Sequence, residues 1–145
     1  MIRDMIIRLA APEDAAELAR LNDEFNGVGR SPAEIEESLR QSKEIVLIAF
    51  LRKKAVGFIC GQYFRSFCYS ELQGEITEMY VMREARGQRI GTSLIKKLEE
   101  ELEKQGVQSI KVLTGNDNYN ARRVYEQSFY ELENEVILHK ELKLW

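Results

Sequence analysis

The order in which strand-like and helix-like patterns follow one another constrains the fold of this chain most strongly. Apolar runs and period-two alternation predict strands over residues 6–9, 44–51, 56–69, 75–81, 108–114 and 136–142. Apolar residues at helical spacing predict helices that open at residues 11–14 and 31–34, and further helices over 92–105 and 118–128. Two helices therefore come before most of the sheet, and strands and helices alternate only near the end.

This order is typical of an α/β chain with a mixed sheet, because a doubly wound sheet needs regular alternation throughout. The run of strands in the middle of the chain indicates an antiparallel meander. We therefore predict an α/β fold with a mixed sheet that contains this meander. With 145 residues, of which 44% are hydrophobic, the chain is expected to form one domain over residues 1–145.

Charge and cysteine content narrow the class of protein. The balance of 24 acidic and 21 basic residues argues against a nucleic-acid binder. No apolar run approaches the roughly 20 residues that cross a bilayer, so we expect no membrane partner. Cys60 and Cys68 lie in one strand-like run, which would hold them roughly 26 Å apart. A disulfide requires Cα atoms within about 7 Å, so we expect reduced cysteines and a cytoplasmic protein.

The segment from Val81 to Thr92 carries the clearest chemical signal. It reads as a strand end, a basic loop that contains Gly87 and Gly91, and a helix start. Such a junction directs unpaired backbone N–H groups and the positive end of a helix dipole at one point, which favours a bound phosphate. An ordinary strand-to-helix connection with solvated arginines fits the spacing equally well. The motifs of a P-loop and of a dinucleotide-binding turn are absent.

The loop and a second motif together resemble the GNAT superfamily of acyl-CoA N-acyltransferases. The pyrophosphate loop of that family runs Gln/Arg-x-x-Gly-x-Gly/Ala, and residues 86–91 fill it, with Arg89 at the first glycine position. The family motif Asn-x-x-Ala-x-x-x-Tyr is matched by Asn118, Ala121 and Tyr125. The Gly-Phe pair that commonly follows is replaced by Phe129-Tyr130.

The resemblance implies an N-acetyltransferase with three layers and a central mixed, mostly antiparallel sheet. Two central strands of that sheet would splay apart to admit acetyl-CoA as co-substrate. Cys60 and Cys68 have no histidine in sequence context, so direct transfer to a primary amine is expected. The end of the strand before the loop would offer its backbone to the pantetheine. The implied cofactor-binding residues are Met79, Tyr80, Val81, Arg86, Gly87, Gln88, Arg89, Ile90, Gly91, Thr92, Asn118, Ala121 and Tyr125.

Three residues are catalytic candidates by the same resemblance. Tyr125 would act as general acid toward the leaving thiolate, although an amphipathic core tyrosine is a common alternative. A lysine-like amine must also lose a proton, which costs roughly 4 kcal/mol at neutral pH. Glu75 and Glu78 are candidate bases for that proton, although either could be a solvated acid. Because strand side chains alternate, we expect only one of them, preferably Glu78, to face the cleft unless a bulge intervenes.

The acceptor and the assembly stay open. Aminoglycosides, polyamines, a protein N-terminus or lysine, and small amino compounds all fit a small-molecule or peptide amine. A single histidine, His139, suggests no metal site, and a homodimer is a family-based expectation. A CoA-binding sensor without turnover and an interaction domain without ligand are the alternatives. The presence of Tyr125 and of two candidate bases favours an enzyme.

Overall fold

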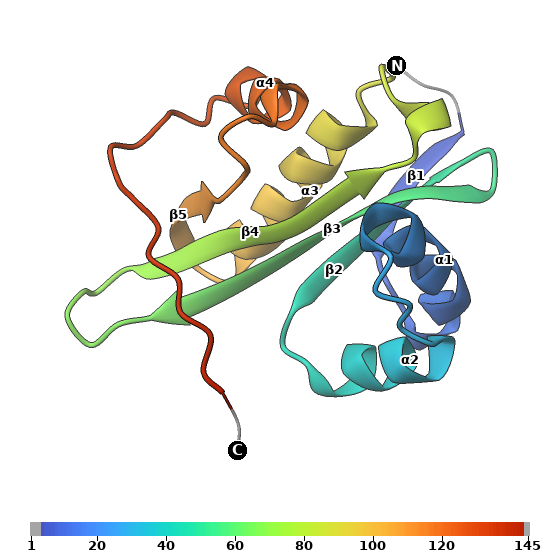
Figure 1. Ribbon diagram of the computed structural model, residues 1–145, viewed down its shortest axis with the longest axis horizontal. Coiled ribbons are helices and arrows are strands. Elements are labelled where there is room, and N and C mark those ends of the chain that lie inside the picture. Colours follow the sequence, from blue (N-terminus) through green and yellow to red (C-terminus); the bar gives the residue numbers. More distant parts are fainter. Residues whose placement is uncertain (1–3, 144–145) are drawn as a thin grey trace.

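The computed structural model describes residues 4–143, which form one mixed sheet with helices on both faces (Figure 1). The strands are β1 (Met5–Leu9), β2 (Ile45–Leu51), β3 (Lys54–Arg65), β4 (Leu72–Val81) and β5 (Val107–Val112). They lie in the order β1-β2-β3-β4-β5, and only the β4–β5 pair is parallel. The prediction of a mixed, mostly antiparallel sheet is therefore confirmed.

Two layers of helices enclose the sheet. The helices are α1 (Ala15–Asn26), α2 (Pro32–Gln41), α3 (Ile90–Lys104) and α4 (Tyr119–Gln127), with short 3-10 turns η1 (Pro12–Asp14) and η2 (Arg83–Ala85). Figure 1 shows α1 and α2 on one face of the sheet and α3 on the other. Side chains confirm this arrangement, because Phe25 of α1 packs on Phe58 of β3 with ring centroids 5.9 Å apart. On the opposite face, a Cβ added at Gly61 of β3 would meet Leu98 of α3 at 2.9 Å.

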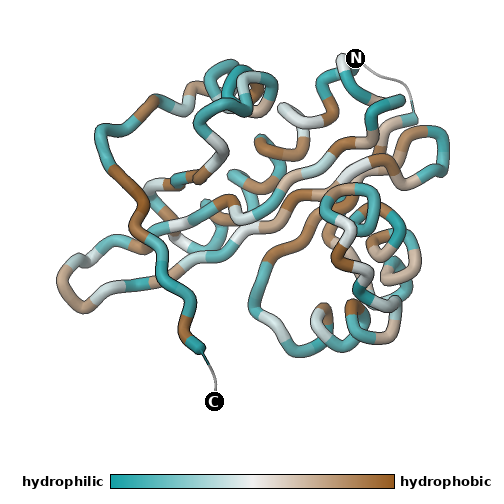
Figure 2. The backbone as a smooth tube through the Cα atoms, in the orientation of Figure 1, coloured by the Kyte–Doolittle hydropathy of each residue, from teal (hydrophilic) through white to brown (hydrophobic). Residues whose placement is uncertain are grey.

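Local sequence signals explain where the helices begin and end. The Ser31 hydroxyl accepts the Glu34 amide at 3.1 Å, while the Glu34 carboxylate accepts the Ser31 amide at 3.0 Å, so α2 begins with the expected capping box. Gly106 has a left-handed φ of 91° and ends α3, as expected of a glycine after a helix. Strands β2 and β3 supply the most hydrophobic stretches of the sheet in Figure 2.

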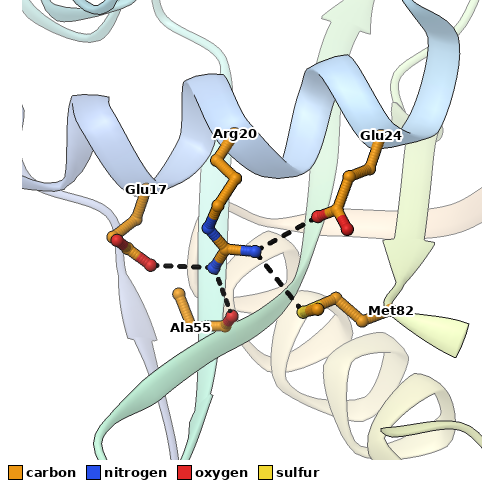
Figure 3. A network of polar contacts seen from close by, with 5 residues as sticks. All are labelled: Glu17, Arg20, Glu24, Ala55 and Met82. Atoms are coloured by element: carbon orange, nitrogen blue, oxygen red, sulfur yellow. Dashed lines mark hydrogen bonds and ion pairs between the residues drawn. The ribbon is translucent and has the colours of Figure 1, made fainter. Parts of the chain in front are cut away.

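A polar network ties α1 to the end of β4 (Figure 3). The Arg20 guanidinium of α1 donates to the Ala55 carbonyl at 2.8 Å and contacts the Met82 sulfur at 3.5 Å. Glu17 and Glu24 flank it at 2.9 and 3.1 Å. Met82 follows β4 directly, so Arg20 fixes the point at which the basic loop leaves the sheet.

Strands β4 and β5 separate toward the C-terminal end of β4. Pairing runs from Leu72 with Val107 to Ile76 with Val112, where β5 ends. Among residues 4–143, no strand pairs with that edge of β4 from Thr77 to Val81. The splayed pair expected from the family resemblance is present.

One expected strand is shorter than predicted, and another does not join the sheet. The expected strand over 56–69 ends at Arg65, because Ser66 starts a turn in which its carbonyl accepts the Tyr69 amide at 3.2 Å. The expected strand over 136–142 is extended but pairs with no strand of the described chain. Its local pattern is that of a strand, but a strand also needs a neighbouring strand, and the position of that neighbour is not encoded locally. No helix among the described residues is long and apolar enough to cross a bilayer.

Candidate active site

The open edge of β4 faces the beginning of α3 and one side of α4. A Cβ added at Gly91, in the first turn of α3, would lie 3.4 Å from Val124 of α4 and 3.8 Å from the Met79 methyl group of β4. Three elements therefore converge at the point where β4 and β5 part. The sequence-predicted residues Met79, Tyr80 and Val81 supply the unpaired strand edge of this notch.

The basic loop contains two residues with a left-handed backbone conformation. Gly87 has φ 80°, and Arg89 has φ 64° and ψ 21°, a left-handed conformation that favours glycine. Arg89 thus has a conformation that glycine, the residue of the family motif at this position, adopts without strain. The first helical bond runs from the Ser93 amide to the Arg89 carbonyl at 3.1 Å, which leaves the amides of residues 90–92 without an intrahelical acceptor. These N–H groups are available to a phosphate.

Side chains of the loop pack back onto its ends. Arg86 Nε donates to the Val81 carbonyl at 2.9 Å, and its guanidinium lies 5.8 Å from the centre of the Tyr80 ring. The Gln88 amide donates to the Ala85 carbonyl at 3.4 Å, and the Thr92 hydroxyl donates to the Arg89 carbonyl at 3.0 Å. Arg86 and Arg89 are both exposed and give the loop its positive charge.

The second family motif positions Tyr125. The Asn118 side chain accepts the Ala121 amide at 3.2 Å and caps α4, so in this structure its contact is that of a helix cap. Tyr125 is only 7% exposed and packs edge-to-face on Tyr130, with ring centroids 5.9 Å apart. The Tyr130 hydroxyl donates to Glu99 of α3 at 2.8 Å, which links this aromatic pair to α3.

Burial sets the protonation state of Tyr125. Burial, with a contribution from the negative charge of Glu78, raises the pKa of Tyr125 to about 12. The phenol therefore keeps its proton at neutral pH.

A bulge places both candidate bases on one face of the sheet. Cys60 pairs with Glu78, but the next residue of β3, Gly61, pairs with Ile76, so Thr77 is an extra residue in β4. Glu75, opposite Gln62, thereby faces the same side as Glu78. The exception that the sequence analysis allowed, a bulge between the two acids, is therefore present.

The two acids have different surroundings. Glu75 lies 3.7 Å from the Lys111 ammonium of β5. For Glu78, burial raises the pKa above the usual value. A carboxylate with a raised pKa is a better proton acceptor, so the surroundings favour Glu78 over Glu75 as a base.

Glu44, which sequence reasoning missed, lies beside this pair. It precedes β2, and burial raises its pKa; the hydrogen bond with Gln62 opposes the rise, and the charge of Glu78 adds to it. In the sequence it is only one acid before an apolar run. Strand pairing brings it near Cys60 and Glu78, and that pairing is invisible in the local pattern.

A cavity of about 170 Å³ opens beside these acids, between α1, α2 and the sheet. Glu44 supplies a carboxylate to its lining, Cys60 a neutral thiol and Arg30 a guanidinium. The other lining residues are Leu18, Asn22, Ile35, Ser38, Leu39, Val46 and Phe58. The cavity lies on the face of the sheet that α1 and α2 cover, whereas Gly91 of the notch belongs to α3 on the other face.

The cysteines and the histidine lie outside the chemistry of this site. Both cysteines are free, as expected. Burial, together with the charges of Glu44 and Glu78, raises the pKa of the Cys60 thiol well above its usual value, so a thiolate nucleophile is disfavoured there. His139 is exposed on the segment after α4. No group of three or more metal-ligating side chains is found within residues 4–143.

Comparison with known proteins assigns the family. The model of the acetyltransferase (GNAT) family matches residues 13–129. An uncharacterised N-acetyltransferase of Archaeoglobus fulgidus is 34% identical over 88 residues, which is 60% of this chain and 60% of that protein. Another from Chlorobaculum tepidum is 29% identical over 141 residues, covering 94% of this chain and 83% of the other. This chain therefore aligns with only part of the archaeal relative.

Solved structures share the fold at low sequence identity. An aminoglycoside acetyltransferase from an uncultured soil metagenomic sample has a TM-score of 0.83 at 20% identity and covers 97% of both chains. A ribosomal-protein-alanine N-acetyltransferase from Brucella melitensis has a TM-score of 0.83 at 20% identity, covering 96% of this chain and 99% of the other. An aminoglycoside N-acetyltransferase in complex with CoA has a TM-score of 0.82 at 18% identity and covers 94% of each chain.

The family match and the separated strands β4 and β5 both agree with the family resemblance seen in the sequence. Acetyl-CoA is the co-substrate of this family, and the open edge of β4 beside the loop suits it. The chain belongs to the acetyltransferase (GNAT) family of acetyl-CoA-dependent N-acetyltransferases.

Proposed function

We propose that the protein transfers the acetyl group of acetyl-CoA directly to a primary amine of a small cationic molecule. The observation that carries this proposal is the gathering of Glu44, Glu75 and Glu78 on one face of the sheet, beside a cavity. Carboxylates attract a protonated amine and accept its proton. The site of the thioester would be the notch on the other side of β4.

The basic loop binds the pyrophosphate in this proposal. The amides of residues 90–92 and the helix dipole of α3 supply fixed positive potential, and Arg86 and Arg89 add charge. The remaining implied contacts, from the strand edge 79–81 and from α4 near Ala121, line the route toward Tyr125.

Glu78 and Tyr125 carry out the two proton transfers of the reaction. Glu78 takes the proton of the attacking amine, directly or through water, as the new N–C bond to the acetyl carbon forms. The C–S bond then breaks, and the Tyr125 hydroxyl donates its proton to the leaving sulfur. Tyr125 suits this role because its pKa of about 12 keeps the phenol protonated until the thiolate develops.

Glu44 would bind a second positive charge of the acceptor. Glu44 lines the cavity, and its charge environment includes Glu78. A diamine or an aminosugar could then place one amine at Glu78 and another at Glu44. The structural neighbours include an aminoglycoside acetyltransferase and a ribosomal-protein-alanine N-acetyltransferase, so small amines and peptides are the two acceptor classes to compare. The homodimer expected from the sequence is likewise a proposal.

An acceptor screen tests the function. Release of CoA thiol would be measured with monoamines, matched diamines, aminoglycosides and peptides with a free N-terminus. We expect the diamines or aminoglycosides to react fastest, and Glu44→Gln to reduce their preference over matched monoamines. Turnover with peptides alone would overturn the small-molecule proposal. Binding of acetyl-CoA without thiol release for any amine would favour the sensor alternative.

A further inference from the structure

The cavity between α1, α2 and the sheet combines apolar walls with two opposite charges. Apolar side chains from both helices and from β2 and β3 form the walls, namely Leu18, Ile35, Leu39, Val46 and Phe58. Glu44 adds a carboxylate and Arg30 a guanidinium. A molecule that fits this lining offers methylene groups to the walls, an ammonium to Glu44 and an anionic group to Arg30.

The two charged groups of the cavity do not neutralise each other. Among residues 4–143, the ion pair of Arg30 is with Glu34, at 3.8 Å. The carboxylate of Glu44 is stabilised instead by the side chains of Gln62 and Cys60 on β3. A ligand that carries both charges can therefore bind to both groups without breaking a contact between them.

Arg30 retains hydrogen-bonding capacity for a ligand. Its Nη2 donates to the Glu34 carbonyl at 3.5 Å and to the Ser38 hydroxyl at 3.4 Å, and both bonds are long. The Glu34 carboxylate also accepts the Ser31 amide at 3.0 Å as part of the α2 cap. A guanidinium has several N–H donors and can bind a carboxylate through parallel bonds. A carboxylate also carries the single negative charge that one guanidinium balances.

The reacting end of such a molecule would lie toward Glu78. Cys60 lines the cavity and is the direct β3 partner of Glu78 on β4. Side chains of directly opposed strand residues point to the same face of a sheet, so the Glu78 carboxylate lies on the face that holds the cavity. An extended molecule with one end at Glu44 can therefore place its other end at the proposed base.

The size and lining of the cavity favour a short methylene chain over a sugar. The volume of about 170 Å³ is close to that of a cavity that holds benzene, roughly 150 Å³. This space accommodates the charged head of an amino acid and part of its side chain. An aminosugar would bury hydroxyl groups against apolar walls that offer them no hydrogen bond, and such burial is unfavourable.

From these observations we infer that the acceptor is a free amino acid with a second amine on its side chain, a diaminocarboxylate such as lysine or ornithine. This inference rests on the proposed function and names its acceptor. The α-carboxylate binds Arg30, the α-ammonium binds Glu44, and the methylene groups lie along the apolar walls. The side-chain amine reaches Glu78.

The transfer itself is the one already proposed. The side-chain nitrogen of the amino acid forms a bond to the acetyl carbon, and the C–S bond of acetyl-CoA breaks. Glu78 takes a proton from the amine, and Tyr125 gives its proton to the leaving sulfur. The products are CoA and an amino acid acetylated on its side chain.

Matched substrates test the two charged contacts separately. Cadaverine is lysine without its carboxylate, and aminohexanoate is lysine without its α-amine; putrescine and aminopentanoate are the corresponding analogues of ornithine. Thiol release should give lysine or ornithine a kcat/KM at least about tenfold above that of both of its analogues, because each lost contact is a charge-assisted hydrogen bond. Mass spectrometry of the product should place the acetyl group on the side-chain nitrogen.

Variants assign each contact to its residue. Arg30→Gln should bring the ratio of kcat/KM for the amino acid to that for the diamine toward one, and Glu44→Gln should do the same for the ratio to the monoamine. Arg40→Gln is the matched control, because Arg40 of α2 pairs with Glu36 at 2.7 Å and does not line the cavity. Both ratios should keep their wild-type values in the control. Arg30 and Arg40 are exposed, so both variants should fold, as circular dichroism would verify.

The other outcomes overturn the inference in distinguishable ways. A diamine or monoamine analogue that reacts as fast as its amino acid would exclude the diaminocarboxylate and leave the proposed function standing. A preference for the amino acid that survives Arg30→Gln would place the carboxylate elsewhere, and acetylation of the α-amine would reverse the orientation. If no amine released thiol, the proposed function would fail and the inference with it.

Discussion

At the scale of single residues, the proposed chemistry asks Tyr125 and Glu78 for opposite protonation states. Tyr125 must hold a proton until the thiolate leaves, and Glu78 must be free to accept one. Burial raises the pKa of both groups, which keeps the phenol protonated and makes the carboxylate more basic. The same environment therefore serves both roles.

Removing the Tyr125 hydroxyl should slow the chemical step and leave binding intact. We expect Tyr125→Phe to lower kcat by about 10²-fold or more, because general acid catalysis contributes on that order. The ring still packs on Tyr130, so acetyl-CoA affinity by calorimetry should change little. Wild-type kcat in this variant would reduce Tyr125 to a packing residue.

The role of Glu78 as the base should be visible in the dependence of kcat/KM on pH. Because the pKa of Glu78 is raised above its ordinary 4.5, wild-type kcat/KM should fall as pH drops through that raised value, where the carboxylate becomes protonated. Glu78→Gln should lose this dependence, react slowly at neutral pH, and recover as pH rises toward the pKa of the amine.

Glu75→Gln is the matched control for that experiment. Glu75 faces the same side of β4 but lies beside Lys111, so its replacement should have a much smaller effect. Profiles of both variants that overlay the wild type would mean that neither acid is the base. A larger effect of Glu75→Gln would exchange their roles.

Residue spacing predicted some of the site and missed the rest for a physical reason. Asn118, Ala121 and Tyr125 share one helix, so their linear spacing fixes their relation in space. The relation of Glu75 to Glu78 depended on an extra residue in a strand, and that of Glu44 depended on strand pairing. Neither bulge nor register leaves a local signal in these segments.

At the scale of elements, the loop before α3 contains a residue that conflicts with its backbone. Arg89 at φ 64° holds a left-handed conformation that costs a residue with a Cβ about 1 kcal/mol relative to glycine. We expect Arg89→Gly to be more stable than Arg89→Ala by about that amount, measured by urea unfolding. Both variants lack the cation, so both should bind acetyl-CoA more weakly and to a similar degree.

Equal unfolding free energies of the two Arg89 variants would contradict the conformational argument. Equal acetyl-CoA affinity of both variants and the wild type would instead remove the cation from the binding site. The two readouts thus separate the backbone of this loop from its charge.

The start of α1 should make stability depend on pH. Asp14 is nearly buried and accepts two bonds from the Arg8 guanidinium, at 2.7 and 2.9 Å, and the Ala11 amide at 2.7 Å. The Arg8 hydrogen bond lowers the pKa of Asp14 below its ordinary 3.8. Its stabilising contribution is therefore complete above about pH 5 and is lost as pH falls through the folded-state pKa.

Asp14→Asn tests this contribution. The variant should lose about 1 kcal/mol of unfolding free energy at neutral pH, since it keeps a polar contact but loses the charge. The difference from wild type should shrink below pH 4, in urea titrations over a range of pH. A difference that is constant with pH would mean that the ion pair contributes nothing.

Helices were predicted more accurately than the C-terminal strand because their signals are local. The cap at Ser31 and the left-handed Gly106 each act within one turn of chain. Residues 136–142 have an equally clear strand pattern, but a strand also requires a neighbour. A pattern in one chain cannot say which strand that neighbour is.

At the scale of the whole molecule, the proposed acetyl-CoA site is where separate parts of the sheet and its helices meet. In this proposal β4 provides the open edge, the loop after η2 binds the pyrophosphate, and α4 provides Tyr125. A molecule bound there contacts segments that are distant in sequence, and it contacts them together only in the folded chain. Binding should therefore stabilise the fold as a whole.

Acetyl-CoA at about 100 times its Kd should stabilise the folded state by about 3 kcal/mol, since it binds the folded chain and not the unfolded one. For a chain of this size that corresponds to a rise in Tm of roughly 5–10 °C, measured by calorimetry. The double variant Arg86→Ala, Arg89→Ala should show a much smaller rise at the same acetyl-CoA concentration, because its loop retains the α3 amides but loses both cations. Tyr125→Phe is the control and should keep the full rise, since its hydroxyl acts only as charge develops on sulfur. An equal rise in the double variant would place the pyrophosphate away from this loop and would leave the exposed arginines as ordinary surface charge.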